Sequence, residues 1–192
     1  MTEVYRPLYL NQAPLLFTAR RTSELIKYAA NGFLAMKITF INEIADLCEK
    51  VGANVQDVSR GIGLDGRIGA KFLHAGPGYG GSCFPKDTLA LAKTAQDHES
   101  PMRLIETTIS INDNRKRAMG RKVISALEGD VRGKKIAVLG LTFKPNTDDM
   151  RDSPAIAVIQ TLQDSGATVA AYDPEGMENA KKLIEGIEYV AG

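Results

Sequence analysis

The segment GPGYGGSCFPKD, residues 76–87, places a cysteine, a lysine and a carboxylate within five residues, directly after closely spaced glycines. Glycine lets the backbone approach a ligand closely, while Cys83, Lys86 and Asp87 would supply a nucleophile, a cation and a carboxylate. Cys83 also precedes a predicted helix, so the helix dipole and the charge of Lys86 would both favour its thiolate form. We therefore interpret Cys83 as a nucleophile.

These residues also have purely structural interpretations. Glycine-rich loops are often only turns, and this one matches neither the P-loop nor the dinucleotide-binding fingerprint. Asp87 is equally well placed to be the N-cap of the predicted helix. The other cysteine, Cys48, lies among apolar residues of another predicted helix and is interpreted as part of the core.

Two further pairs of polar residues are candidates for a site. Lys27 and Asn31 are four residues apart and so share one face of a predicted helix, where spacing alone favours a solvated surface. Lys144 and Arg151 bracket the segment after the first predicted strand, which is where a phosphate would bind in an α/β fold. An exposed loop with ordinary surface charges is the alternative for the second pair.

Residues 1–128 are predicted to form helices joined by loops. Apolar residues recur at spacings of three and four, and capping residues and glycines set the limits of each helix. The predicted helices cover residues 22–51, 55–60, 87–98 and 100–127, with Thr22, Asn54, Asp87 and Ser100 as their caps. Residues 62–82 are predicted to be a loop with one helical turn around Ala70. Residues 1–21 are predicted to be irregular, because Pro7 and Pro14 resist regular structure.

The pattern changes after Gly129. KKIAVLGL (134–141) and TVAAYD (168–173) are typical of buried strands, and Ser153 with Pro154 opens a helix between them. Such a βαβ unit has parallel strands, with ligands at their carboxyl ends, here near residues 141–152 and Asp173. A third strand is predicted from Ile187. The predicted fold class is α/β, with an all-helical region over residues 1–128 and a truncated Rossmann-like parallel domain over residues 129–192.

Composition narrows the classes of partner. The chain has 192 residues and a formal net charge of +1, so no one-signed surface is expected to attract nucleic acid or an anionic membrane. Two distant cysteines without a secretory leader indicate free thiols in a reducing compartment, and we expect a cytoplasmic protein. No metal site is expected.

Three segments resemble the UDP-glucose/GDP-mannose dehydrogenase family. They are ELIKYAANGFLA (24–35), DGRIGAKFLHAGPGYGGSCFPKD (65–87) and GLTFKPNTDDMRDSP (140–154). The resemblance implies an N-terminal NAD-binding domain, a central helical dimerisation region and a C-terminal UDP-binding domain. Because no GxGxxG follows an N-terminal strand here, we expect the sequence to begin after the cofactor domain and the isolated chain to be inactive.

The resemblance also implies the chemistry. The sugar alcohol of UDP-glucose would be oxidised to the carboxylate of UDP-glucuronate by two NAD molecules, through a thiohemiacetal and a thioester on Cys83. Lys27 and Asn31 would stabilise the oxyanion, Asp87 would position the water, and Lys86 and Arg151 would contact NAD. The implied substrate contacts are Lys27, Arg67 (toward the other subunit), Phe72, Leu73, His74, Ala75, Gly76, Gly80, Phe143 and Lys144.

Alternatives remain open at this point. A relative acting on GDP-mannose or on an N-acetylated UDP-sugar carries the same chemistry. A different possibility is a non-catalytic module that binds a UDP-sugar and forms a homodimer through the long helix at residues 22–51.

Overall fold

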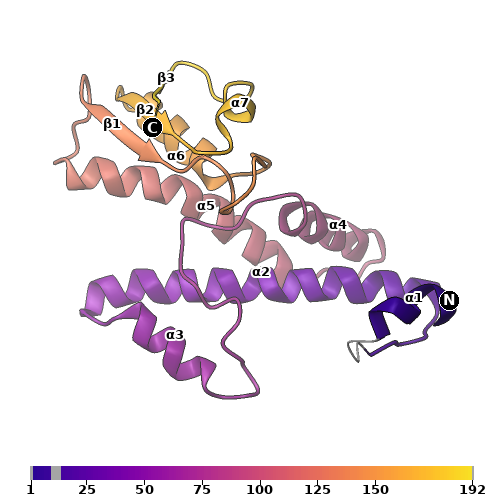
Figure 1. Ribbon diagram of the computed structural model, residues 1–192. Helices are drawn as coiled ribbons and strands as arrows, with labels where there is room; N and C mark the ends of the chain where they lie inside the picture. The colour runs from indigo at the N-terminus through magenta and orange to yellow at the C-terminus, as the bar shows by residue number, and fades with distance from the viewer. Residues whose placement is uncertain (1, 10–13, 192) are drawn as a thin grey trace.

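The computed structural model describes residues 2–9 and 14–191. Its helical part contains α1 (Thr2–Tyr9), α2 (Arg20–Val51), α3 (Val55–Gly63), α4 (Phe84–Asp97) and α5 (Arg103–Ala126). The following part contains β1 (Lys135–Leu139), α6 (Pro154–Asp164), β2 (Thr168–Tyr172), α7 (Met177–Ala180) and β3 (Glu188–Tyr189). The predicted α/β class is therefore confirmed, with helices first and a small parallel sheet after them (Figure 1).

Helix α2 runs along the length of the helical part, and α3, α4 and α5 pack against it (Figure 1). One face of α2 is buried and includes Asn31, Ala35, Thr39, Ile41, Asn42, Ala45 and Cys48. Gly32 lies where a side chain would crowd Leu91 of α4 and Ile105 of α5, so its missing Cβ allows close packing. In the part of the chain described above, no helix is both long and apolar enough to cross a lipid bilayer.

Local capping signals account for several boundaries. Gly52 ends α2 with a left-handed backbone at φ 72°, and its N–H donates to the Cys48 carbonyl. Asn54 caps α3 by accepting from the Gln56 N–H at 2.8 Å. Ser153 caps α6 in the same way, by accepting from the Ala155 N–H at 3.2 Å. The predicted caps Asn54 and Ser153 are confirmed, whereas α2 begins at Arg20 rather than Thr22 and has no side-chain cap.

Two predicted helix starts are wrong. Helix α4 begins at Phe84, with Cys83 rather than Asp87 as its N-cap, because Pro85 in the first turn needs no N–H partner and the Cys83 carbonyl accepts from the Asp87 N–H at 2.9 Å. Helix α5 begins at Arg103. Ser100 does not cap it, because the Ser100 N–H donates back to the Ala95 carbonyl and so completes the end of α4.

Two irregular regions also differ from expectation. Residues 2–9 form α1 although Pro7 lies within it; this proline removes only one donor, and Glu3 in the first turn favours the helix N-terminus. Conversely, residues 64–83, all of which the structure describes, contain turns but no helix around Ala70. Ala70 instead packs its backbone against Gly63 at the end of α3.

The sheet has the order β1-β2-β3 with all strands parallel, so the predicted βαβ unit and third strand are confirmed. Its core includes Leu141, Ile159, Leu162 and Val169, each at most 1% exposed. Burying an aliphatic side chain of this kind stabilises the fold by about 1.5–3 kcal/mol. Helix α6 packs against both β2 and α5 and so joins the sheet to the helical part.

Candidate active site

Asp87 lies at the centre of a polar cluster between α2 and α4. It is 2% exposed, and its carboxylate accepts from the Asn31 side-chain amide at 2.5 Å. Lys27 of α2 lies 3.7 Å from the same carboxylate oxygen, and Lys86 bonds to the other oxygen. The bond from Lys86 lowers the pKa of Asp87 against the opposing effect of burial, and Asn31 and Lys27 lower it further. The cluster therefore holds a buried carboxylate in its charged form.

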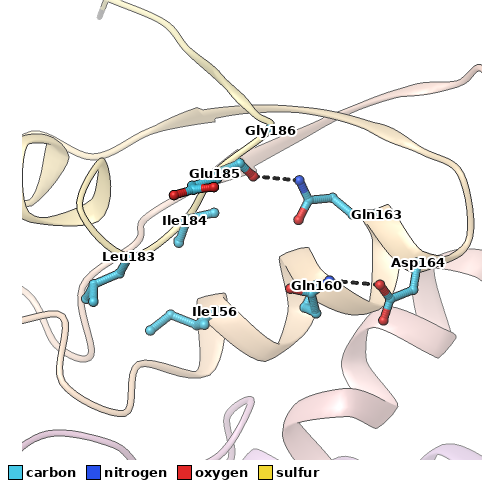
Figure 2. Close-up of a pocket in the computed structure, with 8 residues that line it drawn as sticks. All are labelled: Ile156, Gln160, Gln163, Asp164, Leu183, Ile184, Glu185 and Gly186. Carbon is cyan, nitrogen blue, oxygen red and sulfur yellow. Dashed lines mark hydrogen bonds between the residues drawn. The ribbon is translucent and has the colours of Figure 1, made fainter.

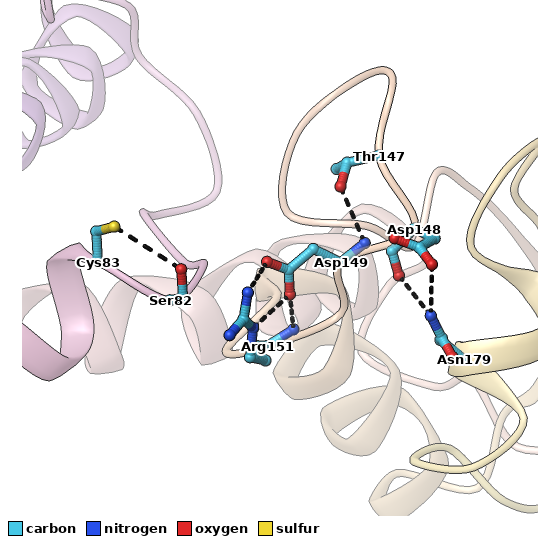
Figure 3. Close-up of polar contacts among 7 residues, drawn as sticks. All are labelled: Ser82, Cys83, Thr147, Asp148, Asp149, Arg151 and Asn179. Carbon is cyan, nitrogen blue, oxygen red and sulfur yellow. Dashed lines mark hydrogen bonds and ion pairs between the residues drawn. The ribbon is translucent and has the colours of Figure 1, made fainter.

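Cys83 is exposed at the N-cap of α4, one helical turn before Asp87. Its sulfur lies 3.7 Å from the Ser82 hydroxyl (Figure 3). Lys86 and Lys27 are 70% and 61% exposed at their side chains, so both ammonium groups remain available to a ligand beside the thiol. An exposed nucleophile thus stands next to cations and a fixed carboxylate.

A cavity of about 480 Å³ is lined in part by Phe84, the residue that follows Cys83. It is formed by the glycine-rich loop, α2 and the loop after β1, and its lining is Ile38, Lys71, Phe72, His74, Gly78, Tyr79, Gly80, Phe84, Phe143 and Lys144. The Phe84 ring meets the rings of Phe72 and Tyr79 edge to face, with centroids 6.0 Å apart in both pairs. Phe72 has a positive φ of 65°, a strained conformation that such a residue keeps only when its surroundings enforce it.

Gly80 and Gly81 join the cavity loop to the loop after β1. The Gly81 N–H donates to the Arg151 carbonyl at 2.7 Å. A side chain at Gly80 would overlap the Asp152 carbonyl, and one at Gly81 would lie 2.6 Å from the Phe143 ring. The absence of side chains at these two positions therefore permits the two loops to meet.

Asp173, directly after β2, organises the start of the loop after β1. It is 3% exposed and accepts from the backbone N–H groups of Leu141 and Thr142 at 2.7 and 3.1 Å. The N–H groups of Glu175 and Gly176 donate to its other oxygen at 2.9 and 2.7 Å. Burial alone would raise the pKa of Asp173, but these four donors lower it to about 2. The carboxylate therefore fixes the carboxyl ends of β1 and β2 relative to each other.

Arg151 lies farther along the same loop and pairs with Asp149 (Figure 3). Two of its guanidinium nitrogens donate to the two carboxylate oxygens, at 2.9 and 2.7 Å. This pairing lowers the pKa of Asp149 to about 2 and raises the pKa of Arg151, with a smaller contribution from Cys83 to the latter. The arginine side chain is still 68% exposed, so it faces solvent on the side of the thiol.

The structure brings most of the sequence-predicted residues together. Lys27, Asn31, Lys86 and Asp87 form the polar cluster, with Cys83 one helical turn before Asp87, and Phe72, His74, Gly80, Phe143 and Lys144 line the cavity. Leu73 instead points into the protein at 1% exposure, and Ala75 and Gly76 are half-buried behind the cavity. Arg67 lies apart, in an exposed loop where it pairs with Asp65 at 2.5 Å.

Sequence reasoning missed the residues that hold the cavity loop from behind. Asn42, Asn112 and Arg115 bond its backbone, and Tyr79 contributes cavity wall. Each looks like an ordinary helix or loop residue in the sequence, and only the tyrosine lies within the glycine-rich motif. Among the residues that the structure describes, no group of three or more His, Cys, Asp or Glu is placed to hold a metal ion.

A larger cavity of about 580 Å³ lies elsewhere, between α6 and residues 183–186 (Figure 2). Gln163 donates to the Glu185 carbonyl at 2.8 Å across it, and Gln160 donates to Asp164 at 2.8 Å along the helix. Its eight lining residues include no cation and no nucleophile. Size alone therefore does not identify the site, and the smaller cavity beside Cys83 is the candidate.

Comparison with known proteins matches two segments of the chain to one family. Residues 21–114 match the UDP-glucose/GDP-mannose dehydrogenase family, central domain, and residues 137–192 match the UDP binding domain of that family. A UDP-glucose 6-dehydrogenase of Rhizobium meliloti (strain 1021) is 85% identical over 188 residues, which is 98% of this chain and 43% of that protein. The chain thus spans less than half of this relative.

Solved structures are similar as well. A UDP-glucose dehydrogenase from Pyrobaculum islandicum has a TM-score of 0.92 at 38% identity, over 100% of this chain and 44% of that one. A UDP-D-ManNAc dehydrogenase from Pyrococcus horikoshii has a TM-score of 0.76 at 28% identity, over 97% of this chain and 45% of that one.

Proposed function

The chain belongs to the UDP-glucose/GDP-mannose dehydrogenase family, and on that basis we propose that it supplies the catalytic thiol and the nucleotide-sugar site of an enzyme that oxidises UDP-glucose to UDP-glucuronate. The observation that carries the proposal is the exposed Cys83 one helical turn from the buried Asp87, which Asn31 and Lys27 of another helix contact. The cavity that Phe84 lines, directly after Cys83 in the chain, has a volume of about 480 Å³, which is within the range of small-molecule sites.

The chain offers residues for the steps that follow the first oxidation, whose base we expect from the part of the enzyme outside this chain. Loss of a hydride and a proton from the alcohol gives an aldehyde, to which the Cys83 thiolate adds to form a thiohemiacetal. Loss of a second hydride gives a thioester, and attack by water releases the carboxylate and restores the thiol. We propose that Lys27 and Asn31 stabilise the oxyanion and that Asp87 positions the water; the contacts of Lys27 and Asn31 with Asp87, one helical turn after Cys83, support these roles.

NAD, when bound, would accept the two hydrides. Lys86 and Arg151 are exposed cations beside Cys83, which fits the phosphate-bearing side of such a cofactor. We propose that these two residues contact NAD. The UDP part of the substrate would contact Phe143 and Lys144, whose ammonium group lies 5.1 Å from the Phe143 ring centre.

The proposal also covers the organisation of the chain and its compartment. We propose a boundary between residues 128 and 129, with the helical region before it and the UDP-binding domain after it. Both cysteines are free thiols, and the exposed one must stay reduced to act as a nucleophile, so we propose that the protein works in the cytoplasm.

The test of function uses the Rhizobium meliloti enzyme with its matching 188 residues replaced by this chain. We expect this chimera to form two NADH for each UDP-glucuronate from UDP-glucose, and far less product from GDP-mannose or UDP-N-acetylmannosamine. The last sugar is a necessary comparison because of the similarity to the Pyrococcus horikoshii enzyme. A preference for either of the other sugars would replace the proposed substrate. The 192-residue chain alone is expected to bind UDP-glucose without oxidising it.

We further propose that two copies associate through α2. Apolar side chains recur every seven residues along its outer face, at Ile26, Phe33, Phe40 and Leu47, and they are 47%, 57%, 50% and 55% exposed. A seven-residue repeat keeps one stripe along a helix, which is the pattern of helices that pack against each other. Arg67, which is exposed and pairs only with the neighbouring Asp65 among the residues described, would reach the substrate of the partner subunit.

The dimer prediction has a matched pair of variants. Leu47 and Leu183 are both 55% exposed, but only Leu47 lies on the stripe. Leu47→Glu would bury a charge in the interface and is expected to give monomers in sedimentation at roughly tens of micromolar chain. Leu183→Glu is expected to remain dimeric. A wild-type monomer at the same concentration would contradict the assignment of α2 as the interface.

A further inference from the structure

The cavity loop is held from behind by three buried side chains that do not line the cavity. Arg115 of α5 donates to the Gly76 carbonyl at 2.5 Å, and Asn42 of α2 accepts from the Gly76 N–H at 2.8 Å. Asn112, one turn before Arg115 on α5, bonds both backbone groups of Tyr79, at 2.8 and 3.1 Å. We call Asn42, Asn112 and Arg115 the loop clamp.

The loop clamp is built around a buried cation. Arg115 is 9% exposed, and besides Gly76 it donates to the Asn42 carbonyl at 3.1 Å and to the Asp46 carboxylate at 2.8 Å. A buried charge is costly unless it is paired and hydrogen-bonded, so the arginine needs all of these acceptors in place. It therefore ties the loop to both helices at once, and the loop cannot shift without leaving the guanidinium unsatisfied.

The positions that the clamp holds lie among those that form the cavity wall, and Tyr79 belongs to both sets. His74 and Gly78 line the cavity two residues before and after Gly76, and Tyr79 and Gly80 line it at the end of the turn. Gly78 also lies where a side chain would contact the Asn112 amide oxygen at 3.0 Å. Because the clamp fixes the peptide groups of Gly76 and Tyr79, it also fixes the orientation of the neighbouring residues that line the cavity.

We infer that Arg115 and Asn112 are positioning residues for the nucleotide sugar, acting through the backbone of residues 76–80. The inference rests on the proposed function for the identity of the ligand. A role in folding alone is a different hypothesis. Under our inference, removing a clamp residue reduces the affinity for the sugar nucleotide by more than it reduces the stability of the protein. Pre-organising a binding loop reduces the conformational entropy lost on binding, which is how distant hydrogen bonds affect affinity.

The test measures UDP-glucose binding by the full 192-residue chain, with hydrogen exchange at the Gly76 and Tyr79 amides as a second readout. Arg115→Ala and Asn112→Ala are each expected to weaken binding on the order of tenfold. Asn112→Ala is expected to speed exchange at Tyr79, whose N–H loses its acceptor, and Asn42→Ala is expected to do the same at Gly76. Millimolar guanidinium, far below denaturing concentrations, is expected to restore much of the affinity of Arg115→Ala by occupying the vacated position.

Lys122→Met is the matched control. Lys122 also joins α5 to α2, through Glu49, but it touches no part of the loop. We expect it to change thermal stability slightly and to leave binding and amide exchange unchanged. Unaltered affinity in Arg115→Ala, or an equal loss of affinity in Lys122→Met, would overturn the inference. If the wild-type chain binds no UDP-glucose, the proposed ligand is wrong, and the exchange rates still decide whether the clamp holds the loop.

Discussion

Replacing Cys83 with alanine in the chimeric enzyme is expected to reduce UDP-glucuronate formation on the order of a thousandfold or more, while UDP-glucose binding stays nearly unchanged. The first hydride transfer requires a base near the alcohol and an oriented nicotinamide, and Cys83 is neither, so it is expected to persist at a reduced rate. The second transfer requires a tetrahedral adduct at the reacting carbon. Without the thiol, that adduct forms only from water, which is less nucleophilic and is not tethered.

The measurement is UDP-glucuronate formed per UDP-glucose consumed, together with the intact mass of wild-type enzyme trapped during turnover. Cys48→Ala is the control, because it also removes a cysteine sulfur, but from a residue that is 5% exposed on the core face of α2. We expect its turnover to stay within a few-fold of wild type if the protein folds. Full-rate acid formation by Cys83→Ala, or a sugar adduct on Cys48, would contradict the assignment of the nucleophile.

Replacing Gly80 with alanine is expected to reduce kcat/KM for UDP-glucose about a hundredfold. The backbone of Gly80 has no positive φ, so alanine is not excluded by conformation. Its methyl group would instead overlap the Asp152 carbonyl, which forces the cavity loop away from the loop after β1. A displacement of about 1 Å between a nucleophile and its substrate is enough for a loss of this size. The same displacement would weaken the bond from the Gly81 N–H to the Arg151 carbonyl.

Gly66→Ala provides the comparison within the same long loop. Gly66 also lacks a positive φ, and a side chain there would meet nothing within 4 Å. Its kcat/KM is expected to equal that of wild type, and both variants are expected to retain wild-type circular dichroism. A Gly80→Ala enzyme with activity within threefold of wild type would show that the contact between the two loops does not position the thiol.

Much of the fold follows from local rules that act within a few residues. The spacing of apolar residues predicts α2, because a helix with one buried face has apolar residues at intervals of three and four. The strand patterns on either side of α6 predict a parallel pair of strands. Asn54, Ser153 and Gly52 set helix ends since the groups that they satisfy are neighbours in the chain. The predicted starts of α4 and α5 are wrong because neither helix has a side-chain cap: Cys83 and Met102 precede them, and the Ser100 N–H is used to complete the end of α4.

The sequence also predicts which residue types could form a site, since Cys83, Lys86 and Asp87 lie within five positions of one another. It did not determine that Asp87 is buried against Asn31, 56 residues earlier, or that Arg115 and Asn112 hold the loop before Cys83. Those contacts depend on how α2, α4 and α5 pack, and the close approach at Gly32 has no local signature. Spacing alone favoured a solvated surface for Lys27 and Asn31. Only tertiary packing placed the amide against a buried carboxylate, because burial depends on what the rest of the chain brings to a residue rather than on its own neighbours.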